Sequence, residues 1–277
     1  MTTANLWKYV YGTLAGTSHL AKGLPCQDNS LICEFTEAGS EPVLLLVASD
    51  GAGGASRADV GSKLVCDSVH ALITAYLKQN ASLSGITKEL TESWLDDWIR
   101  RDLHKQASLE DLQIREFACT LVTALIGTQT SVFFQIGDGA IVIADRDKYR
   151  HIFWPQNGEY ANSTYFVTDD NALDNLLFAK IDHSPVDEIS LFTDGLQNLA
   201  LKFDTKSAHS PFFLPLFTRL RAEEASGESE LLTPLLKEFL GSTAVNERTD
   251  DDKTLLLATR RAADLTQVEE HGQSSSV

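Results

Sequence analysis

The amino-acid sequence predicts an α+β fold in a single domain over residues 1–261. Strand-like and helix-like segments are segregated along the chain rather than alternating, which is typical of helix layers packed on sheets. A chain of 277 residues can bury one large core or two modest ones, and the absence of an internal repeat favours one. The polar residues 262–277 are expected to form a disordered C-terminal tail.

Strands are expected first, followed by two helices. Residues 7–16, 30–35 and 43–49 favour strands, and the last of these is apolar enough to be buried on both faces. Apolar residues then recur at helical spacing over residues 57–79 and again over residues 86–104. In the second of these helices we expect Trp94 and Trp98 to pack the helix rather than to bind a ligand.

The second half of the chain repeats this order of strands before helices. Residues 117–127, 130–137 and 140–146 favour three strands separated by turns, a pattern typical of a β-meander. Residues 154–187 are mixed and turn-rich, and we interpret them as an insert. A strand at residues 188–193, helices around 211–224 and 229–241, and a last strand at 253–260 complete the predicted fold.

Composition and charge restrict the possible partners. The formal net charge of −16 repels nucleic-acid phosphates and anionic lipid, so we expect neither nucleic acid nor membrane as a partner. No apolar run is long enough for a membrane span, and the first residues lack the pattern of a signal peptide, which favours a cytoplasmic location. Four cysteines without close spacing suit reduced thiols in that compartment: Cys26, Cys33, Cys66 and Cys119.

Aspartate stands at five places where an apolar strand ends. A single Asp-Gly is typical of a turn or a helix N-terminus, but strand ends on one side of a sheet converge, and converging carboxylates repel one another. Hard divalent cations such as Mg²⁺ or Mn²⁺ remove that repulsion and prefer oxygen ligands. The sequence therefore indicates a metal site built from some of these residues: Asp28, Asp50, Asp138, Asp194 and the pair Asp251–Asp252.

The loop "DGAGG" at residues 50–54 has a second interpretation, as a nucleotide-binding turn. Its glycines follow a strand and precede a helix, as in a dinucleotide-binding fold. The glycine spacing differs from that fingerprint, however, and the position of the expected acidic residue falls inside the predicted helix 57–79. We therefore favour the metal-site interpretation, in which Gly51 lets the backbone approach an ion closely.

The ordered motifs resemble those of the type 2C, metal-dependent Ser/Thr protein phosphatases, and especially their divergent bacterial branch. The resemblance covers about residues 10–260 and rests on six short motifs in order: "QDN" (27–29), "DGAGG" (50–54), "ACTLV" (118–122), "GDG" (137–139), "TDG" (193–195) and "DDKT" (251–254). It implies a four-layer α-β-β-α sandwich, in which two central, mostly antiparallel sheets are flanked by helix pairs. It also implies an enzyme that hydrolyses phosphoserine and phosphothreonine.

The same resemblance implies roles for individual residues. Asp50 would bridge two Mg²⁺ or Mn²⁺ ions, the Gly51 carbonyl would bind one of them, and Asp194 and Asp251 would hold the other. Asp28 would lie beside the pair, as a ligand or through water, and Asp138 matches the position that contacts a third, weaker ion. Catalysis would depend on Asp28, Asp50, Asp194 and Asp251 together.

Several positions depart from the family pattern. Gln27 replaces a usual glutamate, Ala52 stands where some members carry a histidine, and Asn198 replaces an aspartate of the third ion site. The arginine that grips phosphate before "QDN" is also missing, and we expect Lys22 or His19 to replace it.

Two hypotheses about function follow. In the first, the chain is an active phosphatase acting on a phosphoprotein, opposed by a cognate Ser/Thr kinase. In the second, the changes at Gln27 and Ala52 make it a weak or inactive phosphatase that serves as a binding module for a kinase or a sensor.

Overall fold

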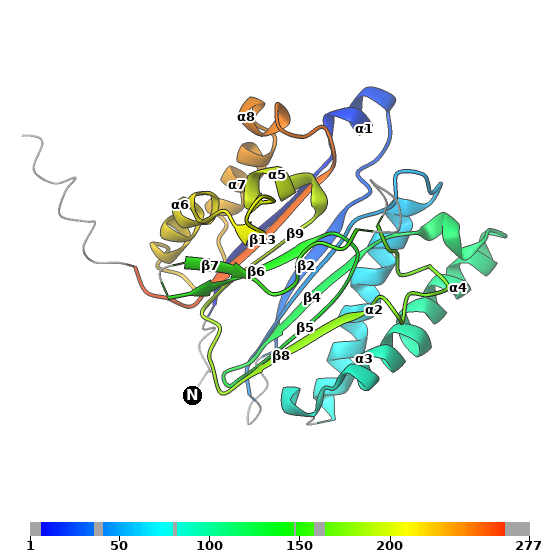
Figure 1. Cartoon of the computed structure of the whole chain (residues 1–277), viewed down its shortest axis with the longest axis horizontal. Helices are drawn as coiled ribbons and strands as arrows, with labels where there is room; N and C mark the ends of the chain where they lie inside the picture. The colour runs from blue at the N-terminus through cyan, green and yellow to red at the C-terminus, as the bar shows by residue number, and fades with distance from the viewer. Residues whose placement is uncertain (1–6, 36–40, 80–81, 147, 158–163, 264–277) are drawn as a thin grey trace, which may run out of the picture.

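Two β-sheets lie face to face at the centre of the molecule (Figure 1). The computed structural model describes residues 7–35, 41–79, 82–146, 148–157 and 164–263. One sheet has five strands in the order β2 (Asn29–Phe35), β3 (Val43–Ser49), β4 (Leu121–Ile126), β5 (Thr130–Ile136) and β8 (Leu177–Asp182). The other has six in the order β12 (Gly227–Glu228), β1 (Lys8–Leu14), β13 (Lys253–Thr259), β9 (Glu188–Phe192), β6 (Ala140–Asp145) and β7 (Lys148–His151). Every pairing within them is antiparallel except that of β1 with β12.

Helices cover the outer face of each sheet (Figure 1). On the five-stranded sheet lie α2 (Ala58–Lys78), α3 (Lys88–Trp94), the π-helix η2 (Leu95–Arg100) and α4 (Arg101–Leu109). On the six-stranded sheet lie α6 (Ser210–Arg221) and α7 (Leu232–Leu240). Short elements complete the described chain: α1 (Thr17–Lys22), α5 (Gln197–Ala200), α8 (Thr243–Asn246), η1 (Leu83–Gly85), η3 (Ile114–Phe117), η4 (Asp194–Leu196) and the hairpin β10 (Leu201–Lys202) and β11 (Ser207–Ala208).

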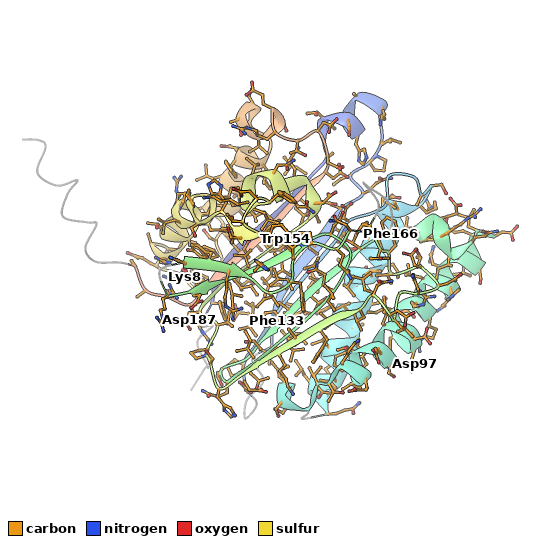
Figure 2. All side chains as sticks on the ribbon, viewed as in Figure 1. Lys8, Asp97, Phe133, Trp154, Phe166 and Asp187 are labelled. Atoms are coloured by element: carbon orange, nitrogen blue, oxygen red, sulfur yellow. The ribbon has the colours of Figure 1, made fainter. Side chains whose placement is uncertain are left out.

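Three apolar layers result from this stacking, one under each helix group and one between the sheets. Successive side chains of a strand point to opposite faces, so Leu45 and Val47 of β3 pack under the helices while Leu44 and Leu46 pack between the sheets. Phe133 of β5 lies in the layer between the sheets, at the middle of the molecule (Figure 2). The predicted four-layer order and the burial of β3 on both faces are confirmed.

The predicted meander over residues 117–146 is wrong in its third strand. Strands β4 and β5 form a hairpin, but β6 pairs with β9 and β7 in the other sheet. The chain crosses between the sheets at Gly137–Gly139, where Gly137 adopts a positive φ of 103° that suits glycine. Local alternation of apolar residues predicts a strand but does not specify its partner, so the crossing was not visible in the sequence.

The helical region 86–104 contains a turn that the spacing did not predict. The π-helix η2 is wider than an α-helix and changes which residues face the core. Trp94 is buried and packs edge to face on Tyr76, as expected. Trp98 instead lies at the surface, 37% exposed, with the Arg101 guanidinium 5.0 Å from its ring centre.

Residues 154–187 contain one strand of the sandwich, β8, and a turn-rich stretch before it. Residues 158–163 of this region and 264–277 of the predicted tail lie outside the described residues. Among the helices that the structure describes, none combines the length and the apolar character needed to cross a membrane.

Candidate metal centre

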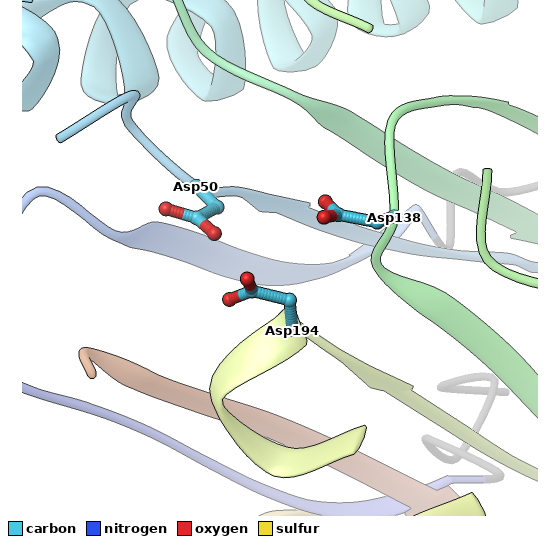
Figure 3. A group of neighbouring side chains, drawn as sticks. All are labelled: Asp50, Asp138 and Asp194. Atoms are coloured by element: carbon cyan, nitrogen blue, oxygen red, sulfur yellow. The ribbon is translucent and has the colours of Figure 1, made fainter. Parts of the chain in front are cut away.

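Three of the predicted carboxylates meet at one edge of the sandwich (Figure 3). Asp50, Asp138 and Asp194 each offer an oxygen atom, and these atoms lie within 4.8 Å of one another. They come from the end of β3, the crossing between β5 and β6, and the end of β9, so both sheets contribute. The strand ends therefore converge as the sequence predicted.

A cavity of about 390 Å³ opens over these carboxylates. Asp251 and Gly51 line it as well, so most of the predicted ligands share one space. The remaining lining residues come from α1, from the segment between α1 and β2, from the loops after β3 and before β4, and from the stretch before β8: His19, Gln27, Ala52, Gly53, Thr120, Thr164 and Phe166. Phe166 lies beside this edge of the sandwich (Figure 2).

Thr120 holds Asp50 in place from the neighbouring strand. Its hydroxyl accepts a hydrogen bond from the Asp50 backbone N–H at 3.0 Å, and its own N–H donates to the Asp50 carbonyl at 2.8 Å. The next residue, Gly51, faces Cys119 in an isolated bridge that leaves the Gly51 carbonyl without a donor among the described residues. A Cβ on Gly51 would lie 2.7 Å from the Ala58 carbonyl oxygen, so only glycine fits here.

Two glutamine side chains hold the loop that presents Asp138. The Gln135 amide donates to the carbonyls of Gly137 and Gly139, at 3.0 and 2.7 Å, and thereby spans the turn. Gln197 donates to the Asp138 carbonyl at 2.6 Å and links the turn to the segment that follows Asp194. Asp138 is consequently fixed at the crossing rather than displayed on a mobile hairpin tip.

Asp194 begins the short helix η4 directly after β9. The following Gly195 packs against the backbone just before β13, because a Cβ there would lie 2.0 Å from the Asp252 carbonyl oxygen. This close approach brings the loop of Asp194 next to the loop of Asp251. Packing therefore requires a glycine after Asp194, in addition to the preference of Asp-Gly for turns.

The remaining predicted ligand, Asp28, is buried. Its Oδ2 accepts hydrogen bonds from the hydroxyls of Thr193 and Thr254, both at 2.8 Å. It does not line the cavity or belong to the group of three converging carboxylates.

The two adjacent aspartates before β13 have different environments. Asp251 is exposed to the cavity, whereas Asp252 is buried. Asp252 Oδ1 accepts from the Gly16 N–H at 2.6 Å, and its Oδ2 accepts from the Gln27 N–H at 2.5 Å and from His19 Nδ1 at 2.9 Å. The spacing could not distinguish the two, because both follow the same loop and precede the same strand.

The electrostatics of the cluster favour protonation or a bound cation. Burial, followed by the carboxylates of Asp28 and Asp194, raises the pKa of Asp50 well above its usual range. Burial, followed by the Asp194 carboxylate, raises the pKa of Asp138 to about 7. Burial also raises the pKa of Asp28 to about 7, despite the two threonine hydroxyls that lower it. A cation among these groups would return them to the charged form.

Unpartnered oxygens support the same conclusion. Asp194 Oδ1, Asp28 Oδ1 and Gln27 Oε1 are buried without a hydrogen-bond partner among the described residues. Buried acceptors are rarely left unsatisfied, and divalent cations are suitable partners for carboxylate and amide oxygens. The donor set therefore fits Mg²⁺ or Mn²⁺.

The two residues predicted to contact phosphate are placed differently. His19 is buried and lines the cavity, whereas Lys22 is exposed and does not. The supporting roles of Thr120, Thr193 and Thr254 were not predicted, and Asp252 was named only beside Asp251 as a candidate for the metal site. All four lie within the quoted motifs, but nothing in the sequence indicated their hydrogen bonds.

Comparison with known families gives a direct match. Residues 15–241 match the family Protein phosphatase 2C. The chain belongs to the protein phosphatase 2C family. The family and the enzyme class expected from the motifs are confirmed.

The similarity of this protein phosphatase 2C chain to its relatives covers nearly its whole length. It is 37% identical over 256 residues to serine/threonine-protein phosphatase 3 of Escherichia coli (strain K12), a match that covers 91% of this chain and 98% of that protein. Its fold resembles that of serine/threonine phosphatase Stp1 from Staphylococcus aureus, with a TM-score of 0.61 at 18% identity over 94% and 97% of the two chains. A bacterial serine phosphatase is similar in fold, with a TM-score of 0.57 at 18% identity over 93% and 99%.

Proposed function

We propose that this protein phosphatase 2C chain hydrolyses phosphoserine and phosphothreonine in proteins by means of a binuclear Mg²⁺ or Mn²⁺ centre. The observation that supports this most strongly is the convergence of Asp50, Asp138 and Asp194 at one cavity, where a buried oxygen of Asp194 has no hydrogen-bond partner in the part of the chain that the structure describes. The relative in Escherichia coli is a serine/threonine-protein phosphatase by name, which supports the same class of substrate.

Each proposed ligand has a structural argument. An oxygen of Asp50 lies within 4.8 Å of oxygens of both Asp138 and Asp194, and the Gly51 carbonyl accepts no hydrogen bond among the described residues, which leaves it available to the same ions. Asp194 and Asp251 lie on adjacent loops held together by the contact of Gly195 with the Asp252 backbone. Asp28, which does not line the cavity, would act as a ligand or through water, and Asp138 would contact a third ion.

The bound ions would make a water molecule more acidic and would neutralise charge on the phosphoryl oxygens. The chain itself orients these groups, since backbone and threonine contacts fix the carboxylates before substrate arrives. Of the two residues expected to contact phosphate, only His19 lines the cavity, since Lys22 is exposed and lies outside it. A phosphoprotein and an opposing kinase are the partners that this chemistry requires.

The alternative is a weak or inactive phosphatase that acts as a binding module. Gln27 lines the cavity with an uncharged amide, so a cation there has one fewer negative ligand than a glutamate would provide. Asn198 likewise supplies no charge to a third ion. The two hypotheses differ in turnover rather than in ion binding, and one set of assays separates them.

The experiment combines activity with direct ion binding. We expect Mn²⁺-dependent turnover of p-nitrophenyl phosphate and a phosphothreonine peptide, and we expect calorimetry to detect Mn²⁺ binding to the apoprotein. Asp50→Asn and Asp194→Asn should each abolish turnover and weaken binding, because each removes a charge from the cluster.

The matched control is Asp204→Asn, which changes an exposed aspartate outside the cavity. Ion binding without turnover of either substrate would favour the binding module. Turnover that is independent of metal, or that survives both cluster variants, would overturn the proposal.

A further inference from the structure

Helix α1 forms a wall of the cavity that is held by one carboxylate. Asp252 accepts hydrogen bonds from Gly16 and Gln27, which lie before and after the helix, and from His19 within it. A further bond runs from the Ser18 N–H to the Asp250 carbonyl at 2.9 Å. Because three of these bonds end on one buried side chain, the position of the whole α1 segment depends on Asp252.

The orientation of the His19 ring follows from the same contact. Its Nδ1 lies 2.9 Å from Asp252 Oδ2, and its side chain is only 10% exposed. A carboxylate that accepts from Nδ1–H fixes the ring and its tautomer. Nε2 has no partner among the described residues, and His19 lines the cavity, so Nε2 is the polar atom that remains for a ligand.

The reaction needs a proton donor that the proposed ligands do not supply. When the bond between phosphorus and the serine or threonine oxygen breaks, the electron pair stays on that oxygen as an alkoxide, which is a poor leaving group without a proton. The other polar side chains that line the cavity are the proposed metal ligands, an amide and two hydroxyls: Asp50, Asp138, Asp194, Asp251, Gln27, Thr120 and Thr164. His19 is the only imidazole among the cavity-lining residues that the structure describes.

We propose that His19 is a catalytic residue that donates the Nε2 proton to the leaving oxygen, and that Asp252 is its positioning residue. The inference rests on the proposed phosphatase function. In the step, the His19 ring starts as an imidazolium that carries a proton on each nitrogen. A new bond forms between phosphorus and the oxygen of the attacking water, which releases one proton to solvent, while the ester bond breaks and the Nε2 proton goes to the serine or threonine oxygen. The neutral imidazole, still protonated at Nδ1, then recovers a proton at Nε2 from solvent water.

A proton donor can be distinguished from a phosphate-binding residue because the rate effect of a proton donor depends on the leaving group. A histidine that only contacts the phosphoryl oxygens assists every phosphate ester alike. A proton donor assists esters of basic alcohols strongly and p-nitrophenyl phosphate little, because p-nitrophenolate leaves without a proton.

The test compares two substrates in His19→Gln and Asp252→Asn. We expect kcat for a phosphothreonine peptide to fall about 10²-fold or more in His19→Gln, in the range that a general acid contributes, while kcat for p-nitrophenyl phosphate changes little. Asp252→Asn should show the same selectivity to a smaller degree. Imidazole added to His19→Ala should restore peptide turnover. His104→Gln, an exposed histidine on α4, is the matched control.

Two further measurements on the wild-type protein test the assignment even if the variants fold poorly. In the wild-type enzyme, kcat across aryl and alkyl phosphates should depend only weakly on the basicity of the leaving group. Nitrogen NMR of the metal-free protein should show the His19 ring protonated at Nδ1, and Asp252→Asn should change that signal. An equal loss on both substrates, a steep dependence on basicity, or Nδ1 unprotonated would overturn the assignment. If the wild type hydrolyses neither substrate, the proposed function itself fails.

Discussion

Neighbouring residues of the same type have different roles in this site, and their surroundings decide which. Asp251 faces the cavity, while Asp252 is buried and holds three hydrogen-bond donors. In the same way Gly51 is enclosed by the Ala58 and Gln27 carbonyl oxygens, whereas Gly54 has open space around it. Such pairs allow tests in which one substitution is the control for the other.

The glycine pair gives the first prediction. Gly51→Ala should reduce activity and ion affinity by at least tenfold, because its Cβ would lie 2.7–2.8 Å from backbone oxygens on two sides and would displace the loop of Asp50. Gly54→Ala, at a position that does not line the cavity, should leave both unchanged. Calorimetry with Mn²⁺ and turnover of a phosphopeptide measure the difference, and equal behaviour of the two variants would contradict the packing argument.

Glu34 on β2 gives a pH-dependent prediction away from the metal centre. Burial raises its pKa to about 7 from an ordinary 4.5, and its Oε1 lacks a partner among the described residues. Between these values the folded state holds a proton that the unfolded state has released, so the free energy of unfolding decreases as pH rises from about 4.5 to 7. Glu34→Gln should reduce this decrease.

Urea denaturation at pH 5 and pH 8 in the presence of EDTA measures the effect. Relative to wild type, Glu34→Gln should gain stability at pH 8 compared with pH 5, because only the wild-type side chain must ionise. Glu230→Gln, at an exposed position, serves as the control and should show no such difference. A constant offset between Glu34→Gln and wild type at both pH values would refute the interpretation.

At the scale of elements, the π-helix η2 connects the outer helices to the cavity. Its last residue, Arg100, donates from one nitrogen to the Val167 and Asp169 carbonyls at 2.6 and 2.7 Å. These carbonyls follow directly after Phe166, which lines the cavity. A wide helical turn thus fixes part of the wall against which substrate would lie.

Arg100→Ala should therefore affect both stability and substrate binding. We expect a loss of about 1–3 kcal/mol in the free energy of unfolding, since two carbonyls lose a charged donor. KM for a phosphopeptide should rise more than kcat falls, because the carboxylates stay in place. Arg101→Ala, whose guanidinium lies over the exposed Trp98, is the control and should change neither. A fall in kcat without a rise in KM would contradict the role of Arg100 in fixing the cavity wall.

Some elements of the fold and the site could be predicted from the sequence alone, and others could not. Aspartates at strand ends predicted the positions of Asp50, Asp138 and Asp194 because strand ends converge by geometry. Helix α1 was missed because six residues carry too little periodicity, and its place depends on the distant Asp252. The crossing at Asp138 and the π-turn were missed because both arise from tertiary packing, which local spacing does not report.

At the scale of the whole molecule, the three apolar layers share strands. Alternate residues of β3 belong to two layers, and Leu255 and Leu256 of β13 do so on the other sheet. Neither sheet can lose its packing without exposing the layer between them. This supports the prediction of one domain over residues 1–261.

We predict a single unfolding transition for the metal-free chain. Tryptophan fluorescence and far-ultraviolet circular dichroism should give coincident urea midpoints, and Mn²⁺ should raise the midpoint by mass action. The chain shortened after residue 261 should keep the same midpoint. Two separated transitions would contradict the single domain.

The position of the carboxylates at the boundary of the two sheets has a consequence for the inner core. Asp50 follows a strand of one sheet and Asp194 follows a strand of the other. The affinity for an ion that binds both therefore depends on the distance between the sheets. Substitutions at Phe133 or Leu191, deep between the sheets and far from solvent, should thus alter the affinity for ions that they never touch. Genetic suppressors of a weakened metal site are accordingly expected in this hidden layer as well as at the cavity.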